Sequence, residues 1–220
     1  WALVRLGDLY RQGSVVDKDE VRAYGYYQQA SDAGIGIAKL RLGEAYIKGL
    51  GVRSDPELGV AYLEAAVSSG EPSALSILGD AYRDGVGTDA DGAKAAQLYE
   101  RAVEAGNLWA LVRLGDLYRQ GSVVDKDYSA AVSYYQRGVE AGVNLAILRL
   151  REVFARGEWV VRDPERIVVM LERAGAAESA AALSLLGDIF MRGGNVPANP
   201  ARASGYYKGA AEKGDDTSLM

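Results

Sequence analysis

Apolar and polar residues follow one another along this chain with a period of 36 residues. Written in blocks of 36 from Ala2, the sequence aligns without gaps into six repeats that each begin with alanine. Leucine occupies position 5 of every repeat, an aromatic residue position 9, and glycine position 12. The repeats cover residues 2–37, 38–73, 74–109, 110–145, 146–181 and 182–217, and residues 218–220 resemble the start of a seventh.

Each repeat is predicted to form two helices. Positions 1, 5 and 9 share one face of a first helix because they are spaced i, i+4, i+8. Glycine at position 12 ends this helix, and Asp or Asn at position 18 caps the next one. Positions 22, 25, 26, 29 and 30 then form the buried stripe of a second helix, which glycine at position 33 ends in five repeats. One such pair cannot bury its own apolar face, so neighbouring pairs must stack into a solenoid.

Glycine also lies inside the first helix, at position 6 of five repeats. It costs about 1 kcal/mol there relative to alanine, so a packing reason is expected. Position 22 is Ala or Gly in the same five repeats, and repeat 5 departs at both positions, with Arg151 and Ile167. We therefore expect the two helices to cross closely at these small residues and to lie farther apart in repeat 5.

The stretch ALSILGDAYRDGVGTDADGAKAAQLYERAVEAG, residues 74–106, resembles the Sel1-like repeat (SLR), a relative of the tetratricopeptide repeat. The resemblance lies in the A-x-x-x-L-G-x-x-Y helix, the following G-x-G, the Asp before the second helix and the A-x-x-x-Y-x-x-A-x-x-x-G ending. It implies an all-α fold, a right-handed αα superhelix (α-solenoid) forming a single domain over residues 1–220. It also implies adaptor roles in bacterial signalling, envelope polysaccharide systems, polarity or secretion, with no common reaction.

Composition removes most reaction chemistry. The 220 residues contain no Cys and no His, which excludes disulfides, thiolate nucleophiles, imidazole bases and almost every zinc site. The net charge is −5 without a basic block, which argues against a nucleic-acid partner. No apolar run approaches the ~18 residues needed to span a membrane. We expect no cofactor, no metal and no membrane insertion by this segment.

The compartment stays open. The start at Trp1, without an initiator Met, indicates a fragment of a longer protein. The absence of Cys suits the periplasm and the cytoplasm alike. The family resemblance alone favours a bacterial periplasmic or other extracytoplasmic location.

Position 7 is acidic in every repeat, which allows two interpretations. These carboxylates could form a ladder that binds a cation or a basic partner. Alternatively, they form ion pairs on the helix surface, since each has a basic residue three or four positions away. Ion pairing is favoured, because members of the ladder should lie about 8–10 Å or more apart.

The first helices are expected to line the concave face of the superhelix, which makes their non-core positions the candidate protein-binding surface. Arginines, acids and scattered apolar side chains are mixed there, as in surfaces that recognise proteins or peptides. The candidate residues are Arg5, Asp8, Arg41, Glu44, Ile77, Asp80, Arg113, Asp116, Arg149, Glu152, Trp109 and Trp159.

Aromatic residues raise two further questions. Trp1, Trp109 and Trp159 are not required by the repeat, so each is a candidate interface anchor. Packing between adjacent repeats is the favoured alternative for Trp1 and Trp109, and Trp159 stays open between the two. Tyrosine pairs at residues 26–27, 134–135 and 206–207 could form a sugar platform, but their buried-stripe positions favour core packing.

The sequence therefore predicts a non-enzymatic scaffold that binds a protein or peptide. One alternative is a cell-wall or glycan-binding hydrolase, which would need Glu152, Glu158 and Glu178 of repeat 5 to converge. Another is self-association through uncapped ends.

One stretch, WALVRLGDLYRQGSVVDKD, occurs twice, at residues 1–19 and 109–127, three repeats apart. The residues that follow the two copies differ, which favours a local event over duplication of three repeats.

Overall fold

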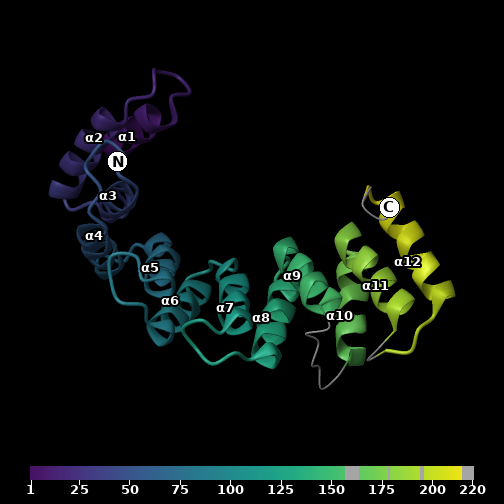
Figure 1. Ribbon diagram of the computed structural model, residues 1–220. Helices are drawn as coiled ribbons and strands as arrows, with labels where there is room; N and C mark the ends of the chain where they lie inside the picture. The colour runs from purple at the N-terminus through teal and green to yellow at the C-terminus, as the bar shows by residue number, and fades with distance from the viewer. Residues whose placement is uncertain (157–163, 178, 194–195, 215–220) are drawn as a thin grey trace. The chain divides into compact units, whose positions relative to one another are not determined.

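A computed structural model describes residues 1–156, 164–177, 179–193 and 196–214. Within them the chain is all-helical, and its twelve helices succeed one another as six pairs, the α-solenoid architecture that the sequence predicts (Figure 1). The helices are α1 (Ala2–Gln12), α2 (Glu20–Asp32), α3 (Gly36–Lys48), α4 (Pro56–Ser68), α5 (Ser73–Asp84), α6 (Gly92–Glu104), α7 (Ala110–Gln120), α8 (Tyr128–Glu140), α9 (Asn144–Ala155), α10 (Pro164–Ala176), α11 (Ala180–Arg192) and α12 (Pro200–Glu212).

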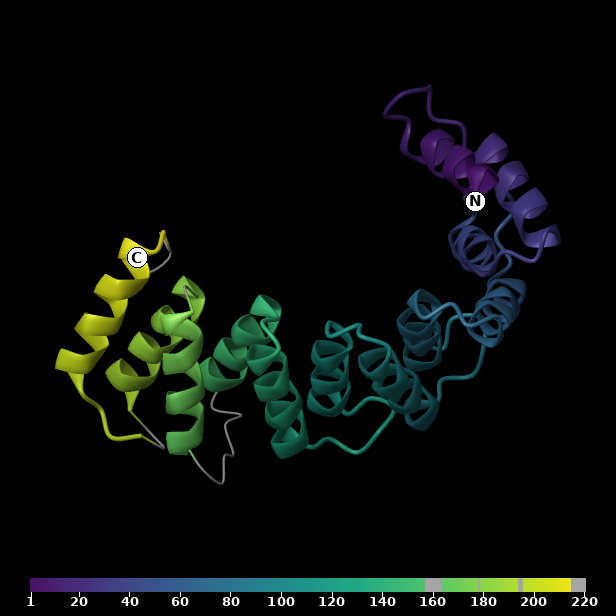
Figure 2. The same cartoon turned by 180° about the vertical axis from the view of Figure 1, so that it is seen from behind.

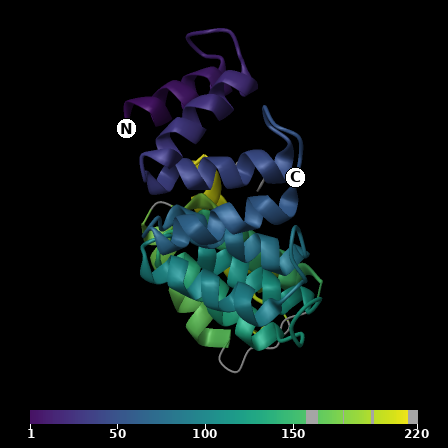
Figure 3. The same cartoon turned by 90° about the vertical axis from the view of Figure 1, so that its left-hand side faces the viewer.

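The chain divides into two compact halves, Trp1–Ala110 and Leu111–Met220. In the N-terminal half each helix packs on the next, from α1 through α6. Figure 3 shows α1 to α4, in purple to blue, as successive layers. Apolar stripe residues such as Leu42, Leu63 and Ala66 are fully buried between these layers.

In the C-terminal half α8 packs on α9 and α10, and α11 packs on α9, α10 and α12 (Figure 2). One apolar core joins these helices, and Leu150, Ile167, Leu171 and Leu186 are completely buried in it. The departures of repeat 5 from the consensus therefore do not interrupt the core.

The helix ends lie where the sequence predicts them. Gly13, Gly49 and Gly85 end first helices in the left-handed conformation, with φ between 65° and 70°. The Asp19 carboxylate accepts a hydrogen bond of 2.9 Å from the amide of Arg22 at the start of α2. Equivalent caps are formed by Asp55, Asp91, Asp127 and Asn199. Asp163, the cap predicted for repeat 5, lies outside the described residues.

Glycine at position 6 has a different partner from the one expected. The expected close crossing with position 22 is present in repeat 2, where a Cβ at Gly43 would lie 2.9 Å from the carbonyl oxygen of Gly59 and 2.8 Å from Cγ of Leu63 at position 26. In repeats 1, 3, 4 and 6 the three nearest atoms all belong to the tyrosine at position 26. A Cβ at Gly79 would lie 2.6 Å from Cε1 of Tyr99. In those repeats the glycine makes room for an aromatic ring.

The tyrosine pairs pack in the core or against it, as the sequence favours, and both members of the third pair, Tyr206 and Tyr207, are half-buried. Tyr27 and Tyr135 are almost fully buried. Their neighbours stack on the aromatic residue of the first helix, with ring centroids 5.7 Å apart for both Tyr10–Tyr26 and Tyr118–Tyr134. Offset stacking of this kind stabilises the pair beyond its area burial.

Candidate protein-interaction surface

The acidic residue at position 7 accepts a hydrogen bond from the tyrosine at position 26 in four repeats. Because the phenol is partly or fully buried, its hydroxyl needs an acceptor inside the protein. The acceptor is an aspartate of the first helix in the same repeat. These bonds are Tyr27–Asp8 at 2.9 Å, Tyr99–Asp80 at 2.7 Å, Tyr135–Asp116 at 2.8 Å and Tyr207–Asp188 at 2.9 Å.

Repeats 2 and 5 differ at both positions. Leu63 and Leu171 replace the tyrosine, and the acid is a glutamate, Glu44 or Glu152. The longer glutamate side chain is held by the arginine at position 4 of its own helix. The Glu44–Arg41 and Glu152–Arg149 hydrogen bonds measure 2.9 and 2.8 Å.

The same arginines also reach the preceding repeat. The Nε atom of Arg41 lies 3.2 Å from a carboxylate oxygen of Asp8, and that of Arg149 lies 3.1 Å from Asp116. Each half therefore contains one four-residue cluster that joins two consecutive repeats. The first cluster is Tyr27, Asp8, Arg41 and Glu44, and the second cluster is Tyr135, Asp116, Arg149 and Glu152.

The tyrosine and the arginine of the first cluster each keep one charge state near neutral pH. Burial, followed by the hydrogen bond to the Asp8 carboxylate, raises the pKa of Tyr27. In repeat 6, burial and then the hydrogen bond to Asp188 raise the pKa of Tyr207 to about 12. Burial alone would lower the pKa of Arg41, but the bond to Glu44 and the charge of Asp8 outweigh it, and the pKa is raised. The guanidinium thus stays charged and fixed between two carboxylates.

In repeats 3 and 6 the aspartate at position 7 forms ion pairs with arginines at other repeat positions. Asp80 pairs with Arg83 at 3.0 Å, one turn along α5. Asp188 pairs with Arg151 of α9 at 3.3 Å. Arg151 is the residue that replaces glycine at position 6 of repeat 5, so this departure provides a counter-ion to the next repeat.

Ion pairing is therefore confirmed as the structural role of the acidic positions. Pairs within one helix include Asp8–Arg11 and Asp116–Arg119, both at 3.7 Å. Among the described residues, no group of His, Cys, Asp or Glu is arranged to hold a metal ion. The tyrosine and inter-repeat arginine partners were not predicted. The sequence contains a signal for these partners, because position 7 is Asp wherever position 26 is Tyr, and Glu wherever position 26 is Leu.

The structure brings together only some of the predicted site residues. Asp8, Arg41 and Glu44 meet in the first cluster, and Asp116, Arg149 and Glu152 meet in the second. Asp80 belongs to a separate group with Tyr99 and Arg83. Arg5 is exposed, and Ile77 and Arg113 are half-buried.

The tryptophans correct one expectation. Packing between repeats was favoured for Trp1 and Trp109, but their side chains are 73% and 58% exposed. The guanidinium of Arg5 lies over the Trp1 ring, 5.7 Å from its centroid. Trp159, Glu158 and Glu178 lie outside the described residues. Of the three acids that the hydrolase alternative requires, only Glu152 is described, and Arg149 holds its carboxylate.

No helix in the described parts of the chain has the length and apolar character needed to cross a bilayer.

Comparisons with known proteins agree with this architecture. The Sel1 repeat matches residues 2–35, 36–71, 72–107, 110–143 and 180–215, which leaves out the atypical repeat 5. A search of curated proteins finds no match.

Two solved structures are similar over nearly the whole chain. One is c5321, a protective antigen of uropathogenic Escherichia coli with an SLR fold (26% identity, TM-score 0.71, 99% of this chain and 46% of that chain). The other is a Sel1 repeat protein from Oxalobacter formigenes (28% identity, TM-score 0.64, 95% of this chain and 84% of that chain). The chain spans less than half the length of the first of these. With five matched repeats over most of its length and the same helix-pair architecture, this chain belongs to the Sel1 repeat family.

Proposed function

We propose that this chain is a non-enzymatic scaffold that presents the surface of its first helices to a protein or peptide partner. Sel1 repeat proteins typically act in protein–protein interaction, and the family is generally non-catalytic. The observation that carries the proposal is the pair of polar clusters, which recurs in the same form in both halves.

These clusters support binding by preorganisation. When a partner docks on mobile arginine side chains, these side chains lose rotamer entropy, which costs about 0.5–1.5 kcal/mol for each side chain immobilised. Arg41 and Arg149 are each already held between two carboxylates, and they keep part of their surface exposed. The carboxylates therefore act as positioning groups, and the arginines and the exposed residues provide the contacts.

Trp109 and Arg5 are the contact residues that can be tested without disturbing the fold. Both side chains are exposed, and tryptophan and arginine are enriched among interface hot spots. Arg41 is less suitable, because reversing its charge would place three acidic groups together in the first cluster. The bacterial envelope, signalling and exopolysaccharide systems are the settings that the family resemblance supports.

The experiment is affinity capture from a lysate of cells that make this protein, followed by mass spectrometry. Wild type is compared with Trp109→Ala and Arg5→Glu, and Arg101→Glu on α6 is the matched surface control. We expect a specific partner to be lost or reduced at least about tenfold in one of the first two variants and retained in the control. Equal recovery by all four proteins would contradict the proposed surface.

A further inference from the structure

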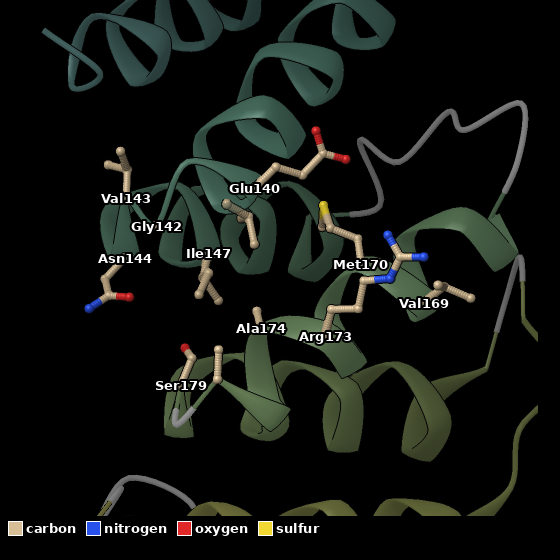
Figure 4. A pocket seen from close by; sticks show the side chains of 12 residues that line it. Glu140, Gly142, Val143, Asn144, Ile147, Val169, Met170, Arg173, Ala174 and Ser179 are labelled. Atoms are coloured by element: carbon tan, nitrogen blue, oxygen red, sulfur yellow. The ribbon is translucent and has the colours of Figure 1, made fainter. Parts of the chain in front are cut away.

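A groove in the C-terminal half lies between second helices, and its lining residues include none of those proposed for the first-helix surface. It encloses about 770 Å³ beside the C-terminal parts of α8 and α10 and the start of α9. Val139, Ile147 and Met170 line it with apolar surface, and Asn144 and Ser179 add polar groups at one end (Figure 4). Its volume is within the range of sites that hold small molecules or short peptide segments.

Two exposed charges of opposite sign flank this groove. Glu140 projects from α8 and Arg173 from α10, the two second helices that border the groove (Figure 4). Neither forms an ion pair with another described residue, in contrast to the acids and arginines of the two clusters. The groove therefore offers one carboxylate and one guanidinium to a ligand.

The corresponding groove of the N-terminal half provides a comparison. It lies between α4 and α6 and encloses about 410 Å³. Val67 and Leu98 occupy the same repeat positions as Val139 and Met170. There Glu64 accepts a hydrogen bond of 2.9 Å from Tyr82, and Lys94 lies over the Tyr82 ring and near Asp91. Arg101, at the repeat position of Arg173, is exposed, as Arg173 is. The larger volume and the exposed carboxylate of Glu140, whose repeat position is Ser68 in the N-terminal half, distinguish the groove beside α10.

We propose that the α8–α10 groove binds an extended peptide segment in which an apolar side chain lies between a basic and an acidic residue. The apolar side chain enters between Val139, Ile147 and Met170. The basic residue pairs with Glu140 and the acidic residue with Arg173. Charge complementarity at both sides argues for this occupant over a purely apolar one. Burying one leucine-sized side chain is sufficient for an affinity gain of about tenfold or more.

This proposal is independent of the first-helix surface, and the methionines allow the two to be tested together. The chain has three methionines. Met170 lines the groove, whereas Met191 is exposed on the first helix α11. In protein labelled at the methionine ε-methyl groups, the NMR signal of Met170 therefore reports binding in the groove, and that of Met191 reports binding at the first helices. Met191→Leu and Met220→Leu variants assign the signals.

The probe is a heptapeptide with blocked ends and the sequence Gly-Lys-Ser-Leu-Ser-Asp-Gly. Three relatives of this peptide are compared with it. The relatives carry Ser in place of Leu, Lys at both charged positions, or Asp at both charged positions. We expect the first peptide to shift the Met170 methyl signal saturably, and the Ser peptide to bind at least about tenfold more weakly. The two relatives with like charges should also bind more weakly than the first.

Substitution of the flanking charges should change the ranking of the peptides. Arg173→Glu should prefer the peptide with two lysines, and Glu140→Arg the peptide with two aspartates. Arg101→Glu, at the same repeat position on α6, should leave the ranking unchanged. Absence of a saturable Met170 shift, or an unchanged ranking in Arg173→Glu, would overturn the proposal. A shift confined to Met191 would also overturn it, while supporting the first-helix surface.

Discussion

The same nineteen residues occur twice in this chain, and the two copies have the same local structure but different burial. Both form a helix over eleven residues, Ala2–Gln12 and Ala110–Gln120. Leu114 in the second copy is 0% exposed, whereas Leu6 at the same position in the first copy is 39% exposed. Helix formation is therefore a local property of the sequence, and burial depends on the neighbouring helices.

The polar contacts of the two copies do not differ in this way. Asp8 and Asp116 both accept a hydrogen bond from a tyrosine hydroxyl of the second helix of their own repeat, and both form an ion pair with an arginine of the repeat that follows. These contacts are the same because the residues on that side are equivalent. A copied stretch thus carries its helix and its polar network with it, but not its apolar burial.

The largest expected effect separates the two copies. Leu114→Ala should destabilise the protein by about 2–5 kcal/mol, because it leaves a cavity in a fully buried site. Leu6→Ala should cost less than about 1 kcal/mol, because the side chain is partly exposed already. Chemical denaturation followed by circular dichroism measures both. Equal losses in the two variants would contradict the comparison.

A second pair of variants tests the clusters. Arg41→Met and Arg149→Met each remove a guanidinium that lies between two carboxylates, and each should cost about 1–3 kcal/mol. The loss should be greater for Arg41, since Glu44 is 16% exposed and Glu152 is 40% exposed, so water solvates Glu152 better. The same denaturation experiment decides this order, and Arg101→Met is the exposed control.

The third pair should give equal effects. Tyr27→Phe and Tyr135→Phe each remove one hydroxyl that bonds to an aspartate, at a cost of about 1 kcal/mol in either copy. A difference of more than about 1 kcal/mol between the two would show that the copies are not equivalent in their polar contacts. Thermal unfolding of both variants against wild type measures it.

The smallest effect concerns pH. The pKa of Tyr207 is raised to about 12, so the folded protein keeps this phenol protonated after the unfolded chain has begun to lose the proton near the ordinary value of 10. Its contribution to stability is therefore complete below pH 10 and is lost as the pH rises toward 12. Tyr207→Phe should weaken the dependence of unfolding free energy on pH in this window. An unchanged slope would show that Tyr207 titrates normally.

Much of the fold follows from the 36-residue period. Gly13 and Asp19 mark helix ends because their effects are local. The position-5 leucines mark the buried stripe in repeats 2 to 6 because their spacing is helical, whereas Leu6 of repeat 1 is exposed. The partners of the position-7 acids were not predicted, because they depend on the reach of side chains between helices. The sequence does indicate these partners, because in repeats 2 and 5 Glu replaces Asp at position 7 and Leu replaces Tyr at position 26.

Other features depend on packing that the repeat pattern does not specify. The exposure of Trp109 was not predicted, because the sequence does not show which side chains cover the residue before a repeat. The α8–α10 groove was not predicted either, because it depends on the width between two second helices.

Site-specific photocross-linking tests the central claim, that the chain binds a protein partner through the first-helix surface, most directly. A photoreactive amino acid is placed at Trp109 or Arg5, and at Ala93, an exposed control position on the second helix α6. The scaffold account predicts a discrete cross-linked protein from Trp109 or Arg5 and none from Ala93. Cross-linking from Ala93 alone, or no cross-linked protein from any of the three positions, would contradict it.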